Sequence, residues 1–120
     1  MMTKIKLAGY EFDGPYSDIE NIRDEPGVYV VMSFRGAHLP IVLDIGTAGE
    51  GMWQDSQGLK RRLKNHSRKS CWEKHRINGK LAYAVLYIQN QKQRLYIEDQ
   101  LRRKFNPPCG TTPPEPFNPL

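Results

Sequence analysis

The sequence predicts one domain of the α/β (α+β) class, in which helices pack on a small sheet. The chain has 120 residues, a length typical of a single domain with a real hydrophobic core. Apolar runs of strand length alternate with segments of helical periodicity in the order strand, strand, helix, helix, strand, helix. No apolar run approaches the ~18–20 residues that a membrane-spanning helix needs, so we expect no membrane association.

The N-terminal half begins with an arm or an extra strand and continues with a hairpin. In residues 1–25, Gly-Pro and neighbouring polar residues interrupt a weak periodicity, which leaves the arm and the strand as alternatives. The β-branched and aromatic run from Val28 to Met32 is followed by a turn at Arg35-Gly36. A second run from Pro40 to Ile45 completes the pattern of a hairpin.

Two short helices and a buried strand follow. The first helix is basic and extends from Leu59 to Ser67, with Leu59 and Leu63 four residues apart on its inner face. A second helical turn is expected from Cys71 to Arg76. The run from Leu81 to Ile88 is apolar at alternating positions on both faces, which is typical of a strand covered on two sides.

The clearest helix extends from Lys92 to Phe105, and a Pro-Pro pair follows it. We expect its buried side to carry Leu95, Tyr96, Ile97, Leu101 and Phe105. Residues 111–120 contain four prolines and little apolar periodicity, so they predict a loose C-terminal tail. The domain itself is therefore expected within residues 26–110.

Positive charge is concentrated in one segment. The chain has a formal net charge of +5, and residues 56–80 carry nine basic residues against one acidic residue, Glu73. Clustered Lys and Arg with an aromatic residue among them are typical of a protein that binds a phosphate backbone, although a solvated helix face is an alternative. The candidate nucleic-acid contacts are Lys60, Arg61, Lys64, Arg68, Lys69, Trp72, Lys74 and Arg76.

The two cysteines, Cys71 and Cys109, do not make a disulfide framework. We therefore expect free thiols and a cytoplasmic protein, in agreement with an N-terminus that has no apolar signal-peptide core. With His66 and His75 the cysteines could form a tetrahedral zinc site, but their spacing matches no common zinc ribbon or finger.

A set of motifs in the middle of the chain resembles the GIY-YIG nuclease domain over residues 26–110. In chain order the set comprises Gly27-Val28-Tyr29, Asp44-Ile45-Gly46, Arg62 with His66 four residues later, Glu98, and the turn Pro107-Pro108. The resemblance implies a small three-stranded antiparallel sheet flanked by helices. It also implies cleavage of phosphodiester bonds with one divalent metal, Mg²⁺ or Mn²⁺.

The resemblance implies a role for each matching residue. Tyr29 would activate or position the attacking water, and Gly27 and Gly46 would belong to the structural motifs. Arg62 would hold the scissile phosphate through its guanidinium fork, with His66 on the same helix face. Glu98 would hold the metal, since hard divalent cations prefer oxygen ligands.

Each of these residues also has an ordinary structural alternative. Tyr29 could be a strand aromatic and His66 a surface residue. Glu98 could pair with Arg94 and Arg102, each four residues away on the same helix.

The chain departs from the family pattern at two positions. Asp44 occupies the place of the second signature tyrosine, where it would add a metal ligand, take the base role, or cap the Gly46 turn through its own backbone. Gly110 stands where the family places an asparagine, and Asn106 lies just before the proline turn.

The sequence thus predicts a metal-dependent endonuclease or phosphodiesterase that acts on DNA, with RNA and branched nucleic acid as further candidate substrates. A nucleic-acid-binding module that has kept the fold without the chemistry is the alternative. A domain whose basic face meets an acidic protein partner is a third possibility.

Overall fold

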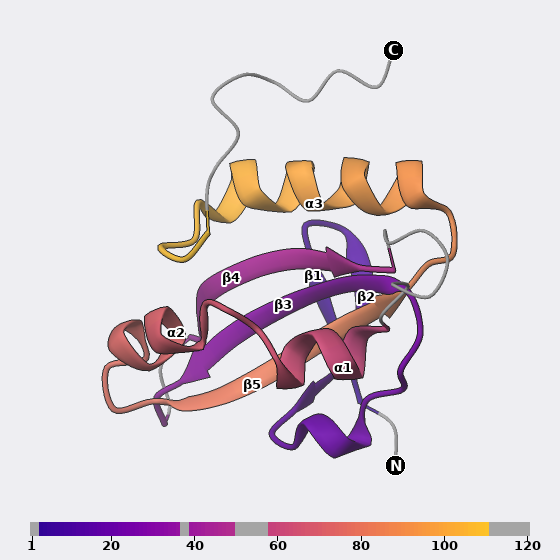
Figure 1. The fold of residues 1–120 in the computed structure, drawn as a ribbon. Helices are drawn as coiled ribbons and strands as arrows, with labels where there is room; N and C mark the ends of the chain where they lie inside the picture. The colour runs from indigo at the N-terminus through magenta and orange to yellow at the C-terminus, as the bar shows by residue number, and fades with distance from the viewer. Residues whose placement is uncertain (1–2, 37–38, 50–57, 111–120) are drawn as a thin grey trace.

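The computed structural model describes residues 3–36, 39–49 and 58–110, and shows a five-stranded antiparallel sheet with helices on both faces (Figure 1). The predicted C-terminal tail, residues 111–120, lies outside the described residues. The elements are β1 (Lys4–Leu7), β2 (Tyr10–Tyr16), a 3₁₀ turn η1 (Ile19–Asn21), β3 (Gly27–Phe34), β4 (Ile41–Ala48), α1 (Leu59–Lys64), α2 (Lys69–His75), β5 (Lys80–Tyr87) and α3 (Gln91–Phe105).

The α+β class and the order from β3 to α3 confirm the sequence prediction, but the predicted three-stranded sheet is wrong. The strand order is β1-β2-β5-β3-β4, so the expected three strands form one side of a wider sheet. The N-terminal residues add a hairpin, which pairs with β5 at Asp13↔Val85 and Tyr16↔Tyr83. These strands were hard to predict because β1 has only four residues and a Gly-Pro pair interrupts the alternation of β2.

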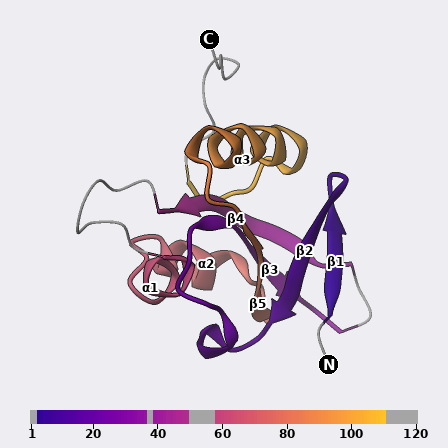
Figure 2. The same cartoon turned by 90° about the vertical axis from the view of Figure 1, so that its right-hand side faces the viewer.

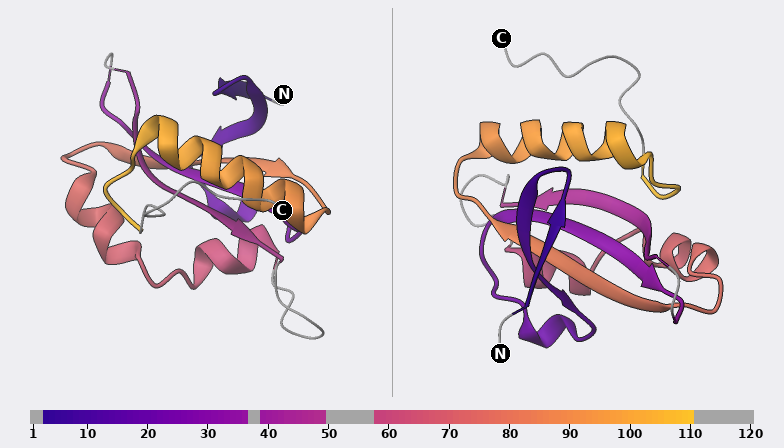
Figure 3. Two further views of the ribbon diagram at one scale, coloured as in Figure 1. Left: turned by 90° about the horizontal axis from the view of Figure 1, so that it is seen from above. Right: turned by 180° about the vertical axis from the view of Figure 1, so that it is seen from behind.

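The sheet separates two hydrophobic layers. Tyr29 and Val31 of β3 pack in one layer with residues of α1 and α2, whereas Val28 and Val30 pack in the other layer with residues of α3. Figure 2 shows α3 on one face of the sheet and α1 and α2 on the other. Seen from above, α3 crosses the sheet on the side opposite to α1 and α2 (Figure 3). This two-sided burial explains why β3 is apolar at nearly every position.

Helix α3 begins at an Asn90 cap, whose side chain accepts the backbone N–H of Gln93 at 3.0 Å. Its buried residues are Arg94, Ile97, Leu101 and Arg102, whereas Tyr96 is 45% exposed, so the predicted place of Tyr96 on the buried side is wrong. Sequence periodicity assigned the inner face to apolar side chains, but the two arginines find polar partners there. Within the described part of the chain, no helix is long and apolar enough to cross a membrane.

Cys71 and Cys109 form a disulfide with Cα atoms 5.9 Å apart, so the prediction of free thiols is wrong for this structure. The backbone N–H of Cys109 donates to the Leu43 carbonyl at 3.0 Å, which holds the segment after α3 against the edge of β4. From there Cys109 reaches α2. The spacing of 38 residues between the cysteines carries no signal for this approach, since it depends on the path of the chain around the sheet edge.

Candidate active site

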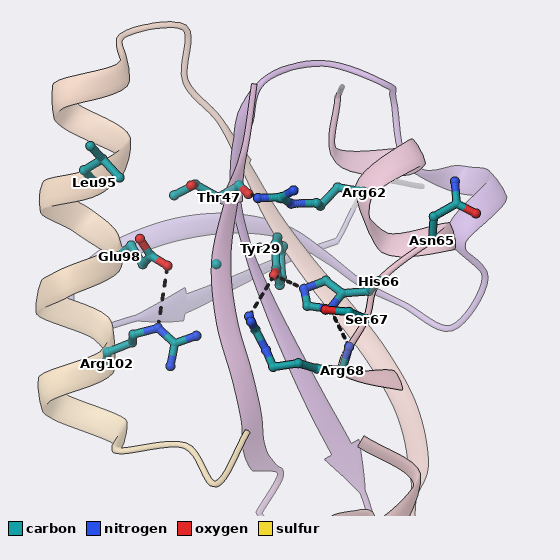
Figure 4. A pocket seen from close by; sticks show the side chains of 11 residues that line it. Tyr29, Thr47, Arg62, Asn65, His66, Ser67, Arg68, Leu95, Glu98 and Arg102 are labelled. Carbon is teal, nitrogen blue, oxygen red and sulfur yellow. Dashed lines mark hydrogen bonds and ion pairs between the residues drawn. The ribbon is translucent and has the colours of Figure 1, made fainter. Parts of the chain in front are cut away.

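A cleft of about 570 Å³ lies where α3, the end of β4 and the α1–α2 connection meet (Figure 4). It is lined by Tyr29, Gly46, Thr47, Arg62, Asn65, His66, Ser67, Arg68, Leu95, Glu98 and Arg102. Four of the residues singled out from the sequence, one each from β3, α1, the α1–α2 connection and α3, share this cleft: Tyr29, Arg62, His66 and Glu98. These four residues are up to 69 positions apart in the chain, between Tyr29 and Glu98.

Gly46 makes room for the Tyr29 side chain. The two residues are cross-strand partners in the β3–β4 ladder. A Cβ atom at position 46 would overlap the Tyr29 hydroxyl and ring, so only glycine lets the ring lie across β4 toward the cleft.

We expect Gly46→Ala to lower the free energy of unfolding by about 1–3 kcal/mol, the range for overpacking a well-packed interior. Urea denaturation measures this. In a Tyr29→Leu background the same substitution should cost clearly less, because the ring that it meets is gone. Equal costs in both backgrounds would show that the glycine is needed for another reason.

The hydrogen bonds around Tyr29 fix the tautomer of His66. The Nδ1 atom of His66 accepts the backbone N–H of Arg68 at 3.1 Å, and its Nε2 atom is hydrogen-bonded to the Tyr29 hydroxyl. A neutral imidazole has one N–H, so the hydrogen is on Nε2 and His66 donates to Tyr29. Arg68 Nη2 approaches the same oxygen at 3.4 Å. The Tyr29 hydroxyl hydrogen is thus left to donate into the cleft.

Burial sets the protonation of both rings. It lowers the pKa of His66 to about 4, and the nearby positive charge of Arg68 acts in the same direction. Burial also raises the pKa of Tyr29 above its usual value, and the negative charge of Asp44 is the second cause in the same direction. The guanidinium groups of Arg68 and Arg62 lower this pKa and only partly oppose the rise. At neutral pH, His66 is a neutral donor and Tyr29 keeps its proton.

The depressed pKa of His66 predicts a pH dependence with a definite sign. Because the unfolded chain takes up the proton near pH 6.5 and the folded chain near 4, the stabilisation is complete above about 6.5 and is lost as the pH falls toward 4. NMR titration of the His66 ring, assigned with His66→Gln, should give an apparent pKa close to 4. A midpoint near 6.5 would mean that the ring is solvated and not a fixed donor to Tyr29.

Asp44 lies beneath the cleft and does not line it, so the prediction that it joins Tyr29 there as a metal ligand or base is wrong. The carboxylate is 0% exposed. It accepts hydrogen bonds from Arg68 Nε at 2.8 Å, Arg102 Nη2 at 3.0 Å and Trp72 Nε1 at 2.8 Å. It also accepts the backbone N–H of Ile45 at 2.8 Å, in partial agreement with the alternative that it serves the local backbone.

The second departure from the family pattern also has a structural explanation. Gly110 has a positive φ of +85°, and a Cβ atom there would press on the Arg102 guanidinium. Asn106 ends α3 in the left-handed conformation, where its backbone N–H donates to the Arg102 carbonyl at 2.8 Å. Asn106 does not line the cleft.

Glu98 and Arg62 face each other across the cleft in Figure 4. The Glu98 carboxylate is 3.6 Å from Arg102 Nε, and Arg62 Nε donates to the Thr47 carbonyl at 3.3 Å. The ion pair of Glu98 with Arg102, which was the structural alternative for Glu98, is therefore present. Arg94, the other arginine of that alternative, donates to backbone carbonyl groups, among them that of Gly49 at 3.0 Å. His66 lies beyond the end of α1 at Lys64, so its expected place on one helix face with Arg62 is wrong, although both residues line the cleft.

The candidate nucleic-acid contacts fall into three groups. Exposed or half-buried side chains are Lys60, Arg61, Lys64, Lys69, Lys74 and Arg76. Arg68 lines the cleft and is bound to Asp44. Trp72 is only 1% exposed and packs in the core beneath the cleft, so the prediction that it contacts nucleic acid is wrong. The prediction failed because an aromatic residue within a basic run can also be the residue that packs a short helix against the core.

The sequence pattern does not include Thr47, Asn65, Ser67, Leu95 or Arg102, although all five line the cleft. Of these five residues, Arg102 could have been assigned to the site from the sequence, because it is four residues from Glu98 on a predicted helix. Comparisons with protein-family models, curated proteins and solved structures find no match to this chain.

Proposed function

We propose that this protein is a GIY-YIG-like endonuclease that cleaves DNA phosphodiester bonds with one bound Mg²⁺ or Mn²⁺. The observation that carries the proposal is the convergence on one polar cleft of four of the five residues given a catalytic or metal role from the sequence, namely Tyr29, Arg62, His66 and Glu98. An unrelated set of surface residues would have no reason to meet there.

The side chains of the cleft suit a divalent cation. Glu98 presents a carboxylate that is 24% exposed, and the hydroxyl groups of Thr47 and Tyr29 line the same space. Mg²⁺ is commonly held by one or two carboxylates together with waters and substrate phosphate oxygens, so one carboxylate fits this ion. A bound Mg²⁺ would polarise the phosphate and stabilise the leaving oxygen.

The other residues of the cleft would bind the phosphate and orient the attacking water. Arg62 can form two parallel hydrogen bonds to a phosphate, and Arg68 and Arg102 add positive charge at the floor of the cleft. His66 donates to Tyr29 and so holds its oxygen in place, while the Tyr29 hydroxyl hydrogen is available to a water or a phosphate oxygen. Because burial raises the pKa of Tyr29, we assign it the positioning of the attacking water rather than the removal of its proton.

The decisive experiment is a cleavage assay with the purified full chain. Supercoiled plasmid, linear duplex, a four-way DNA junction and single-stranded RNA are incubated with Mg²⁺ or Mn²⁺, and in parallel with a chelator. We expect metal-dependent cleavage of at least one DNA substrate. No cleavage under any of these conditions would exclude the enzymatic function.

Arg62 and Arg61 provide a matched pair for a mutational test. Arg62 lines the cleft, whereas Arg61 lies outside it and forms an ion pair with Asp24, in which Arg61 Nε is 3.7 Å from the Asp24 carboxylate. We expect Arg62→Ala to reduce the rate at saturating DNA about 10²–10³-fold, as expected for the loss of one donor to the transition state. Arg61→Ala should change mainly the affinity. Equal losses of rate would mean that Arg62 contributes only to the general positive field.

A nucleic-acid-binding module without hydrolysis is the second candidate. It is favoured by the protonated state of Tyr29 and by Asp44, which replaces the second signature tyrosine and is buried. This alternative predicts DNA binding that weakens steeply with salt and no cleavage with any metal. The third possibility, an acidic protein partner, remains only if nucleic acid does not bind at moderate salt.

A further inference from the structure

We propose that Cys71, His75 and Cys109, once the cysteines are reduced, form a Zn²⁺ site that is separate from the cleft. In the structure the two sulfur atoms and a ring nitrogen of His75 all lie within 4.8 Å of one another. None of the three residues lines the cleft. The site therefore stands on a different set of residues from the proposed nuclease function.

Reduction of the disulfide must let the sulfur atoms move apart before they reach the distances of a tetrahedral zinc site. Zn–S bonds of about 2.3 Å and Zn–N bonds of about 2.0–2.1 Å place two sulfur ligands about 3.8 Å apart, and a sulfur and a nitrogen about 3.5 Å apart. In the structure the two sulfur atoms are bonded to each other, and all three ligand atoms lie within 4.8 Å of one another. Once the cysteines are reduced, the two sulfur atoms have to separate to about 3.8 Å, while the ring nitrogen of His75 is already within 4.8 Å of both.

The backbone holds the three ligands from two sides. Cys71 and His75 are one turn apart on α2, so their side chains lie on one helix face. Cys109 is fixed from the other side by its N–H bond to the Leu43 carbonyl. Thiolate and imidazole ligands in this number suit Zn²⁺ and leave one position of the tetrahedron for water.

The charges of the ligands and of nearby side chains also favour Zn²⁺. Two thiolates neutralise one Zn²⁺, and Lys69 and Lys74, which lie beside the ligands in sequence, favour the thiolate form. The neighbouring Arg68 and Arg76 are paired with Asp44 and Glu73. His66, the fourth residue of the zinc site considered from the sequence, is not a ligand here. Both of its ring nitrogens are engaged, one by Tyr29 and one by Arg68.

Disulfide and metal site exclude each other. The sulfur atoms of the disulfide are bonded and cannot both act as thiolate ligands. A dithiol reductant such as dithiothreitol gives two electrons and two protons to the disulfide, becomes a cyclic disulfide itself, and leaves two thiols. Zn²⁺ then displaces the two thiol protons as it binds. In either state α2 stays tied to the segment after α3.

The test uses the full chain in two redox forms. One sample is reduced with dithiothreitol and freed of it without oxygen, the other is oxidised, and both are titrated with Zn²⁺ against a chromophoric chelator. We expect one ion per chain in the reduced form and none in the oxidised form. No binding by the reduced chain, or equal binding by both forms, would overturn the proposal.

Variants separate the three ligands from adventitious thiol binding. His75→Ala should weaken Zn²⁺ binding at least 10-fold, and Cys71→Ser should remove it. His66→Ala should leave it unchanged. Circular dichroism checks that each variant is folded, and protection of the thiols from alkylation by added Zn²⁺ gives a second readout in the reduced wild-type chain. Unchanged affinity in His75→Ala, or lost affinity in folded His66→Ala, would show that the ligand set is wrong.

Discussion

Replacing Asp44 by asparagine should lower the free energy of unfolding by about 3 kcal/mol, toward the lower end of the range for a broken buried ion pair. The substitution keeps the size of the side chain and one acceptor oxygen but removes its charge. Arg102, which is only 5% exposed, then loses its buried carboxylate partner. Since small domains have about 5–15 kcal/mol of stability, the variant should still fold but with a much lower urea midpoint.

The reason is the number of donors that converge on this one group. Two arginines, the Trp72 indole and a backbone N–H all donate to the carboxylate. Arg68 also faces the cleft, whereas the Trp72 indole and the Arg102 guanidinium are buried and cannot find water in place of the carboxylate without opening the core. Without Asp44, Arg102 keeps only the partly exposed Glu98 as a counter-ion, at 3.6 Å from Nε. A buried guanidinium that has lost its buried counter-ion costs more than the net gain that the pair contributes. Removing both partners should therefore cost less than removing one.

Two comparisons make this prediction specific. Asp24→Asn changes an exposed carboxylate that pairs with Arg61, and it should alter stability by less than about 1 kcal/mol. The double variant Asp44→Asn, Arg102→Met should recover part of the stability lost in Asp44→Asn, because the buried charge has gone. If Asp44→Asn is as stable as the wild type, the buried carboxylate does not hold this part of the core.

Asp44 also explains how the cleft keeps its positive floor. Arg68 and Arg102 both line the cleft, and both are held from below by the same carboxylate. Without it their like charges would repel and the side chains would move apart. Asp44 therefore positions the two arginines of the cleft floor from beneath.

Much of the fold follows from local patterns in the sequence. The runs that became β3, β4 and β5 are apolar and β-branched, and α3 has a Pro-Pro stop, so the order of elements could be predicted. The hairpin of β1 and β2 could not, because its short strands become stable only through the pairing of β2 with β5, about 70 residues later. The disulfide was missed for the same reason, since it depends on a path around the edge of the sheet.

The candidate site could also be predicted only in part. The pattern of Tyr29, Arg62, His66 and Glu98 led to residues that do line one cleft. The roles of Asp44 and Trp72 were misjudged for different reasons: the resemblance placed Asp44 in the cleft, and the basic run around Trp72 indicated a surface position. Here they satisfy each other in the interior, at 2.8 Å between Trp72 Nε1 and Asp44 Oδ2.

The sharpest test of the proposed chemistry concerns Glu98. We expect Glu98→Gln to reduce metal-dependent cleavage by about 10³-fold or more, since a bound metal stabilises the transition state by several kcal/mol and each 1.36 kcal/mol is a factor of ten. The amide keeps the size of the side chain and removes the charge that holds the cation. DNA affinity measured with a chelator present should change little, because the arginines of the cleft are intact.

The neighbouring residue supplies the control. Asp99 pairs with Arg103 at 3.0 Å and does not line the cleft, so Asp99→Asn removes the same charge one position away on the same helix. It should cleave at close to the wild-type rate. If Glu98→Gln and Asp99→Asn behave alike, Glu98 serves only its ion pair with Arg102. If Glu98→Gln alone loses activity and regains part of it at high Mn²⁺, the carboxylate is a metal ligand, because only a weakened metal site responds to the concentration of the metal.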